Sequence, residues 1–340
     1  MNHDLSNPSE PEHVLKGLSR YRYKKPQDSL QEVQTGIRRW CWEYLRLSKD
    51  YWMICQTSKG ANIATIDPEL RKLYRKFGDI HSGSFDDWWV QRGYRVFSEI
   101  DPFPKVKLIP SRPSERASQH PTQNSIWVEI PIKLSKRTIQ KKIGILLNEY
   151  ESIRPRSRME LSSAGFKFNT VQFGTHILKK VHEVYALHRE LVQKPKWIKQ
   201  NNPKSAKYVE KADLFRIGKL LKLSPSNEYA KKVEELEKTH NRMRVAVSRN
   251  LKNANLIIRN LETGIFPSYA PIELQNNRFT ATQLEQHKEL EEKWWSLNLI
   301  SDLSIQKLKE VKAIHYEEPD HIRENILIHQ KDRVVIVRDA

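Results

Sequence analysis

Cationic and amide side chains that can bind a polyanion recur at helical spacing between residues 240 and 260. On an α-helix they lie on one side, and an aliphatic row lies on the other: Met243, Val247, Leu251, Ala254 and Ile258. Arg and Lys neutralise phosphates, and Arg and Asn hydrogen-bond to base edges. The pattern predicts a helix that places one face on a nucleic acid, with an ordinary solvated face as the alternative. The residues expected on that face are Arg242, Arg249, Lys252, Asn253 and Asn260.

Positive charge is concentrated around this helix. Residues 154–260 hold 24 Lys and Arg against 9 Asp and Glu, whereas residues 261–340 hold 10 against 14. The whole chain carries a net charge of +18 and has a pI near 9.7. This balance predicts an acidic partner, above all nucleic acid, with an anionic membrane surface as runner-up. The further cationic residues expected to contact it are Arg154, Arg156, Arg158, Lys194, Lys196, Lys199, Lys204, Lys207, Arg216 and Lys219.

Trp197 lies within a lysine-rich stretch, residues 194–207, that also contains Pro, Asn and Ser and is predicted as an exposed loop. Its indole could stack on a nucleobase or anchor the loop to the body, and the sequence leaves both interpretations open. A helix expected over residues 213–223 and the turn after it resemble the first helix and turn of a helix-turn-helix unit. An aromatic and cationic patch at residues 20–25 could also contact bases and phosphates, or dock on the body.

Three carboxylates and a histidine near residue 80 are the weak candidates for metal chemistry: Asp79, His81, Asp86 and Asp87. Their spacing matches no metal signature, and a helix cap that begins at Ser84 explains two of them. A nuclease core would need a Glu-x-Lys pair in its second strand, but Glu129 and Lys133 stand four residues apart. The sequence also lacks Gly-x-x-x-x-Gly-Lys, Gly-x-Gly-x-x-Gly, Gly-x-Ser-x-Gly and Cys-x-x-Cys motifs. We therefore predict no metal site, no cofactor and no catalytic residue.

Hydrophobic periodicity predicts a mainly α fold with a minor α+β part. Helices are expected over residues 31–57, 68–76, 84–97, 136–150, 175–192, 213–223, 228–237, 240–260, 280–297 and 303–314. Short β-branched runs at 105–109 and 125–132 predict a strand pair, and residues 325–338 a C-terminal β-hairpin. Three parts follow: a flexible basic and aromatic arm (1–30), a Trp-rich helical unit with the strand pair (31–153), and a basic helical unit with acidic C-terminal helices and the hairpin (154–340).

These patterns together predict a non-catalytic protein that binds nucleic acid. Duplex DNA is preferred because the charge is placed on helices, whereas RNA-binding domains more often use aromatic-bearing sheets. Two alternatives stay open: a metal-dependent nuclease or strand-transferase, and a scaffold or RNA-binding component of a ribonucleoprotein assembly. The acidic C-terminal part is a candidate for self-association or for a protein partner. Because no run of about 18 apolar residues occurs, and because Cys41 and Cys55 are interpreted as buried thiols, we expect a cytoplasmic protein without membrane contact.

Overall fold

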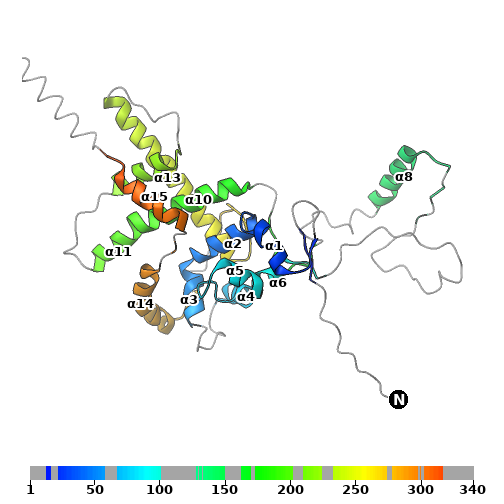
Figure 1. Cartoon of the computed structure of the whole chain (residues 1–340), viewed down its shortest axis with the longest axis horizontal. Helices are drawn as coiled ribbons and strands as arrows, with labels where there is room; N and C mark the ends of the chain where they lie inside the picture. Colours follow the sequence, from blue (N-terminus) through cyan, green and yellow to red (C-terminus); the bar gives the residue numbers. More distant parts are fainter. Residues whose placement is uncertain are drawn as a thin grey trace, which may run out of the picture.

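The computed structural model describes residues 13–16, 22–57, 67–100, 128, 130–131, 133–149, 162–169, 173–201, 210–223, 233–273, 278–297, 299 and 302–316 (Figure 1). Its elements are β1 (Leu15–Lys16), β2 (Arg22–Tyr23), α1 (Pro26–Val33), α2 (Ile37–Arg46), α3 (Lys49–Thr57), α4 (Pro68–Phe77), α5 (Phe85–Trp88), the π turn η2 (Trp89–Gly93), α6 (Tyr94–Phe97), α8 (Lys136–Glu149), α10 (Thr175–His188), the π turn η3 (Arg189–Gln193), α11 (Lys194–Asn201), α12 (Glu210–Leu220), α13 (Val233–Glu262), α14 (Ala281–Ser296) and α15 (Asp302–Ala313). The predicted mainly α fold is confirmed.

Local signals in the sequence set where several of these helices begin. Asp67 Oδ1 accepts hydrogen bonds from Glu69 N at 2.9 Å and Leu70 N at 3.1 Å, which satisfies two free N–H groups at the start of α4. Ser84 caps α5 in the predicted way, with its Oγ 3.2 Å from Asp87 N. The predicted helix over 31–57 is divided into α1, α2 and α3 by turns after residues 33 and 46. Because the turns change the direction of the chain, each of the three helices can bury its aromatic or aliphatic side.

A Trp-rich hydrophobic cluster forms the centre of the body. It includes Trp42, Trp89 and Trp294, and it draws on α1 to α6, α10, α13 and α14. The buried Tyr44 hydroxyl on α2 donates a hydrogen bond to the Leu178 carbonyl on α10 at 2.9 Å, so the two halves of the chain share polar contacts as well. The division at residues 153/154 stays a prediction, although this one cluster has members on both sides of it.

Part of the predicted flexible arm is packed on the body instead. β1 and β2 pair in antiparallel fashion, with Leu15 opposite Tyr23, and the Leu15 side chain is completely buried. The Tyr94 hydroxyl of α6 donates to the carbonyls of His13 and Tyr23, at 2.8 and 2.9 Å. Burial of Leu15 and these bonds hold the described residues of this segment against the body, whereas the division of the chain at residue 30 stays a prediction. Residues 17–21, which include part of the basic patch, lie outside the described residues.

The second half of the chain is organised around α13. The two helices predicted over 228–237 and 240–260 form a single helix from Val233 to Glu262, and Gly264, at φ 85°, follows its end. α12 and α10 pack along α13. A Cβ at Gly218 of α12 would lie 3.3 Å from the side chains of Met243 and Val247, so glycine allows these helices to approach closely.

α10, η3 and α11 form a continuous helical run, and its first part, α10, lies beside α13 (Figure 1). Within η3 the Lys194 N–H bonds to the Arg189 carbonyl five residues earlier, instead of four. The stretch predicted as an exposed loop from residue 194 is therefore helical up to Asn201, and this prediction is wrong for the residues that the structure describes. Residues 202–209 lie outside them.

α8 stands apart from the other labelled helices in Figure 1. None of its described side chains is buried, and Ile145 is 55% exposed. Most of the predicted strand pair and the whole predicted C-terminal hairpin lie outside the described residues; positions 128, 130 and 131, which are described, are not in a strand. Among the described residues, no helix combines the length and the apolar character that crossing a bilayer requires.

Candidate nucleic-acid interface

One exposed side of α13 is lined with cations. The side chains of Lys238, Arg242, Arg249, Lys252 and Arg259 recur at intervals of three, four or seven residues and are all exposed. We call this set the α13 basic stripe. No Asp or Glu occurs in the 24 residues between Glu237 and Glu262, whereas both of those flanking positions are acidic. The stripe therefore presents five positive charges on one helix face without an intervening carboxylate.

The opposite side of α13 holds the helix against the body, as the aliphatic row predicted. Met243, Val247, Ala254 and Ile258 are buried, and Leu251 is half-buried. This amphipathic arrangement fixes the orientation of the stripe, because rotating α13 would expose the aliphatic row to water.

Two asparagines predicted on the exposed face differ from that prediction. Asn253 is half-buried at the edge of the face. Asn260 is buried: its amide nitrogen donates to the carbonyls of Leu256 and Ala270, each at 2.8 Å. The chain that follows Gly264 turns back along α13 and covers Asn260. For Asn260, the prediction of an exposed position is wrong for this reason.

The predicted contact residues near position 196 lie on α11 and differ in exposure. Lys196 and Lys199 are exposed, whereas Lys194 is half-buried and its Nζ lies 3.4 Å from the Glu190 carboxylate. Trp197 is half-buried and stacks on Trp295 of α14, with ring centroids 6.1 Å apart and an interplanar angle of 29°. The Trp197 indole thus anchors α11 to α14.

The remaining cationic candidates fall into two groups. Arg216 is half-buried: its guanidinium bonds to the Ile314 carbonyl at 2.9 Å and to Asp213 at 3.2 Å, so it connects α12 to the chain end of α15. Lys219 is exposed, with its Nζ 5.8 Å from the centre of the Phe215 ring. The others lie outside the described residues: Arg154, Arg156, Arg158, Lys204 and Lys207.

The weak metal candidates have local structural roles. Asp79 Oδ1 accepts from the His81 backbone N–H at 3.0 Å, and Asp86 accepts from the Gln34 amide at 3.0 and 3.1 Å. Asp87 accepts from the Ser84 hydroxyl at 2.5 Å, as part of the α5 cap. Among the described residues, no three His, Cys, Asp or Glu side chains are grouped in a way that could hold a metal ion.

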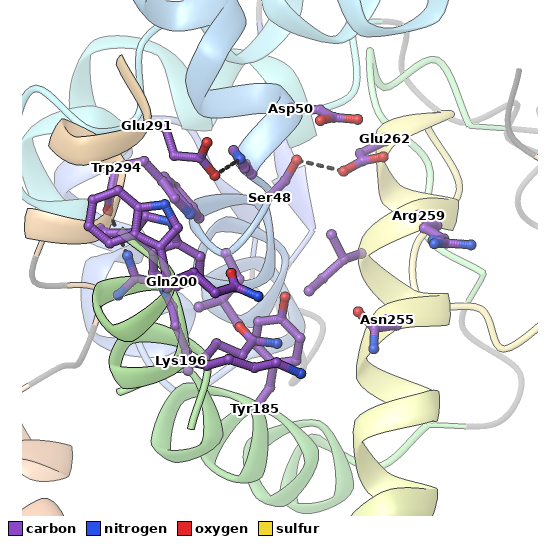
Figure 2. Close-up of a pocket in the computed structure, with 17 residues that line it drawn as sticks. Ser48, Asp50, Tyr185, Lys196, Gln200, Asn255, Arg259, Glu262, Glu291 and Trp294 are labelled. Carbon is purple, nitrogen blue, oxygen red and sulfur yellow. Dashed lines mark hydrogen bonds and ion pairs between the residues drawn. The ribbon is translucent and has the colours of Figure 1, made fainter. Parts of the chain in front are cut away.

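A pocket of about 510 Å³ lies between the C-terminal part of α13 and the helices α3, α10, α11 and α14 (Figure 2). We call it the interhelical pocket. Asn255 and Arg259 reach it from α13, and Lys196 and Gln200 reach it from α11, across the opening. Arg259 belongs both to this pocket and to the α13 basic stripe, so the two features are continuous.

A buried ionic cluster closes one end of the pocket. Arg278 lies 2.5 Å from Glu262 and 3.0 Å from Asp50, and the Ser48 hydroxyl donates to Glu262 at 2.6 Å. Burial, and after it the nearby Asp50 carboxylate, raises the pKa of Glu262. Burial is the largest single influence on the pKa of Arg278 and lowers it, but the charges and hydrogen bonds of Glu262 and Asp50 together outweigh burial, and the net shift is upward. The cluster connects the start of α3 and the end of α13 to Arg278, which lies just before α14 in the chain.

An aromatic wall forms another side of the pocket. The Arg189 side chain, which η3 places in the interior, lies over the rings of Trp294 and Trp295, 4.9 and 5.2 Å from their centres. Arg189 also donates to the Trp294 carbonyl at 2.7 Å. π turns within helices are frequent at functional sites. Here the π turn places an arginine where it fixes the two tryptophans.

The sequence prediction missed several of these residues. Lys238 and Arg259 were detectable, because they continue the same three-, four- and seven-residue spacing as Arg242 and Lys252. Arg189 carries no such signal, because its position depends on the π turn.

No protein-family model matches the chain, and neither a curated protein nor a solved structure matches it. The proposals below are therefore based on the charge, exposure and shape of the described residues.

Proposed function

We propose that this protein binds nucleic acid, with duplex DNA as the preferred form, through the α13 basic stripe. The observation that supports the proposal is the run of exposed cations from Lys238 to Arg259 on a helix face that contains no carboxylate. A solvated helix usually mixes both signs of charge on its exposed face. Like charges on one helix face repel one another, and a bound polyanion that neutralises them removes this repulsion.

The dimensions of the stripe suit a duplex. At 1.5 Å per residue, Lys238 and Arg259 are separated by about 31 Å along the helix axis, which is close to the 34–36 Å of one duplex turn. A duplex carries one phosphate charge per about 1.7 Å of its axis, so every cation of the stripe can find a phosphate. Between the cations, Asn241, Ser248 and Asn255 are exposed and offer uncharged hydrogen-bonding groups.

The test is the salt dependence of binding to a labelled 30-base-pair duplex. If each of the five cations neutralises one phosphate, the slope of log affinity against log salt is about −4.5, since each contact contributes about −0.9. The triple variant Arg242→Gln, Arg249→Gln, Lys252→Gln is expected to reduce the steepness by about 2.7. Glutamine keeps the helix propensity close to that of Arg and Lys, so α13 itself should persist.

A matched control removes the same charge elsewhere. Lys136→Gln, Lys141→Gln, Lys142→Gln changes the net charge by the same three units on α8, where all three side chains are exposed. Its slope should equal that of the wild type. Equal slopes for the two triple variants would show that net charge, and not the α13 basic stripe, governs binding; a flat salt profile for the wild type would contradict the proposal itself.

A second candidate, an assembly role with a protein partner, is favoured by one observation on α8. Ile145 and Leu146 are 55% and 38% exposed, and no described side chain of this helix is buried. Exposed apolar groups of this kind mark association surfaces when they are contiguous. The double variant Ile145→Ser, Leu146→Ser would then lower the mass measured by light scattering in low salt, and an unchanged monomeric mass in both proteins would dismiss this candidate.

A further inference from the structure

The interhelical pocket has a carboxylate end whose charges are compensated. Glu291 pairs with Lys49 at 2.6 Å, and Glu262 and Asp50 both pair with Arg278. Figure 2 shows Glu291, Asp50 and Glu262 together on this side of the pocket. These paired carboxylates can still accept hydrogen bonds from the amino or hydroxyl groups of a ligand.

Two cations flank the opening of the pocket. Lys196 of α11 and Arg259 of α13 are exposed, and no ion pair joins either of them to a carboxylate of the described residues. Gln200, exposed on the same helix as Lys196, adds an amide that can both donate and accept. An anionic group is therefore attracted to the opening, between Lys196 and Arg259.

One side of the pocket is lined by indole rings. Trp197 is half-buried, lines the pocket and stacks on Trp295. Trp294 and Trp295 are held in place by Arg189. Rings fixed in this way are preorganised for stacking, because binding orders no further side chain.

We propose that the interhelical pocket binds one unpaired nucleotide, with its base against Trp197 and its phosphate at the opening, between Lys196 and Arg259. A nucleotide has a flat ring, an anion and hydrogen-bond donors. The pocket offers a partner for each of them: the indole rings, the cations and the carboxylates. The volume of about 510 Å³ is in the range of ligand pockets, about 300–1,000 Å³. Lys196 and Arg259 set the orientation, since they attract the phosphate to the opening of the pocket.

The nucleotide must be unpaired, because the ring faces of a base inside a duplex are covered by its neighbours. This inference rests on the proposed function, that the chain binds nucleic acid, and it adds a second site of different specificity. Arg259 lies in both, so a strand that leaves a duplex on the stripe would enter the pocket directly. A free nucleotide has the same chemistry, and the experiment separates these two sources.

The experiment measures the affinity of the full chain for three labelled probes: an eight-nucleotide single strand, adenosine monophosphate, and the 30-base-pair duplex. Trp197→Leu keeps an apolar contact with Trp295 but removes the ring face. Stacking on an aromatic contributes about 1–3 kcal/mol per base, which corresponds to a loss in single-strand affinity of about five- to 150-fold. Trp197→Phe should restore part of that loss.

A lysine pair on α11 provides a matched control. Lys196→Gln is expected to make the salt slope for the single strand shallower by about 0.7, the contribution of one phosphate contact to a single strand. Lys199→Gln removes the same charge from an exposed position of the same helix that does not line the pocket. The sequence also predicts Lys199 as a contact, but this variant should change the slope by less than Lys196→Gln does, and an equal change would contradict the assignment of the phosphate to the pocket.

The outcomes separate this proposal from the first one. Single-strand binding that weakens in Trp197→Leu while duplex binding is retained supports the pocket as a nucleotide site within a strand. Adenosine monophosphate binding with the same dependence on Trp197 supports it with a free nucleotide as the source. If the duplex binds but the single strand binds wild type and Trp197→Leu with equal affinity, the pocket proposal alone is overturned. If the wild type binds none of the three probes, both proposals are overturned.

Discussion

Replacing Arg278 by methionine removes the cation that neutralises a buried carboxylate. Arg278 and Glu262 have side chains only 7% and 6% exposed and lie 2.5 Å apart. The substitution leaves Glu262 with the Ser48 hydroxyl as a hydrogen-bond donor at 2.6 Å. Removing one partner of a buried ion pair costs about 3–5 kcal/mol, which is a large fraction of the 5–15 kcal/mol by which proteins are usually stable. With an m-value of about 3 kcal/mol/M, the urea midpoint falls by about 1–1.7 M.

The pH dependence of this loss identifies its cause. The pKa of folded Glu262 is raised above the ordinary value of 4.5. The folded state therefore binds the proton more tightly than the unfolded state, and the penalty for ionised Glu262 grows as the pH rises from 4.5 through the folded pKa. Without Arg278 the penalty is larger, so the difference in unfolding free energy between variant and wild type should narrow on acidification.

Urea unfolding followed by circular dichroism at several pH values measures both effects. Adding Glu262→Gln to the Arg278→Met variant removes the stranded charge and should recover much of the stability. Arg249→Met, which removes an exposed arginine of α13, is the matched control and should change the free energy by less than about 0.5 kcal/mol. A loss below about 1 kcal/mol in Arg278→Met, or no recovery with Glu262→Gln, would refute the reasoning.

Three further predictions concern the body of the protein. Gly93→Ala would place a Cβ 2.5 Å from the Trp88 ring and should lower the free energy of unfolding by about 1–3 kcal/mol. Gly144→Ala, whose Cβ meets nothing within 4 Å, should instead slow amide exchange in α8, because alanine favours the helix. An equal loss of unfolding free energy in both variants would contradict the packing around Gly93. Tyr44→Phe removes the hydroxyl that donates a second hydrogen bond to the Leu178 carbonyl of α10 and should cost about 0.5–1.5 kcal/mol in urea unfolding, and an unchanged midpoint would show that the bond is dispensable. Burial raises the pKa of the Cys41 thiol, so a thiol reagent at pH 8 should label it only after unfolding, and rapid native labelling would contradict its burial.

The parts of the fold that the sequence predicts are those set by neighbours in the chain. Ser84 caps α5 and Thr280 begins α14 with a capping box, because each bonds to groups only three residues away. Gly264 follows the end of α13 because its backbone adopts a positive φ. The aliphatic row of α13 is visible for the same reason: its period is the period of the helix.

The parts that the sequence does not predict depend on segments far apart in the chain. Asn260 has the spacing of an exposed residue, yet the carbonyl of Ala270 binds it in the interior. Arg216 has the character of a phosphate contact, yet its guanidinium bonds to the carbonyl of Ile314, 98 residues away. Trp197 stacks on a ring of α14, and the pocket beside it is assembled from five helices. Such contacts leave no periodic trace in a single sequence.

Because of the π turn η3, the shape of the pocket depends on the number of residues in this turn. Each residue rotates a helix by about 100°, and η3 bonds across five residues where an α-helical turn would bond across four. Deleting one residue from η3 would restore the α-helical register and turn α11 by about 100° around its axis. Trp197 would then leave Trp295, and Lys196 would leave the pocket, although no side chain of α11 had been replaced. At this place, the length of the chain specifies the pocket as much as the identity of its side chains.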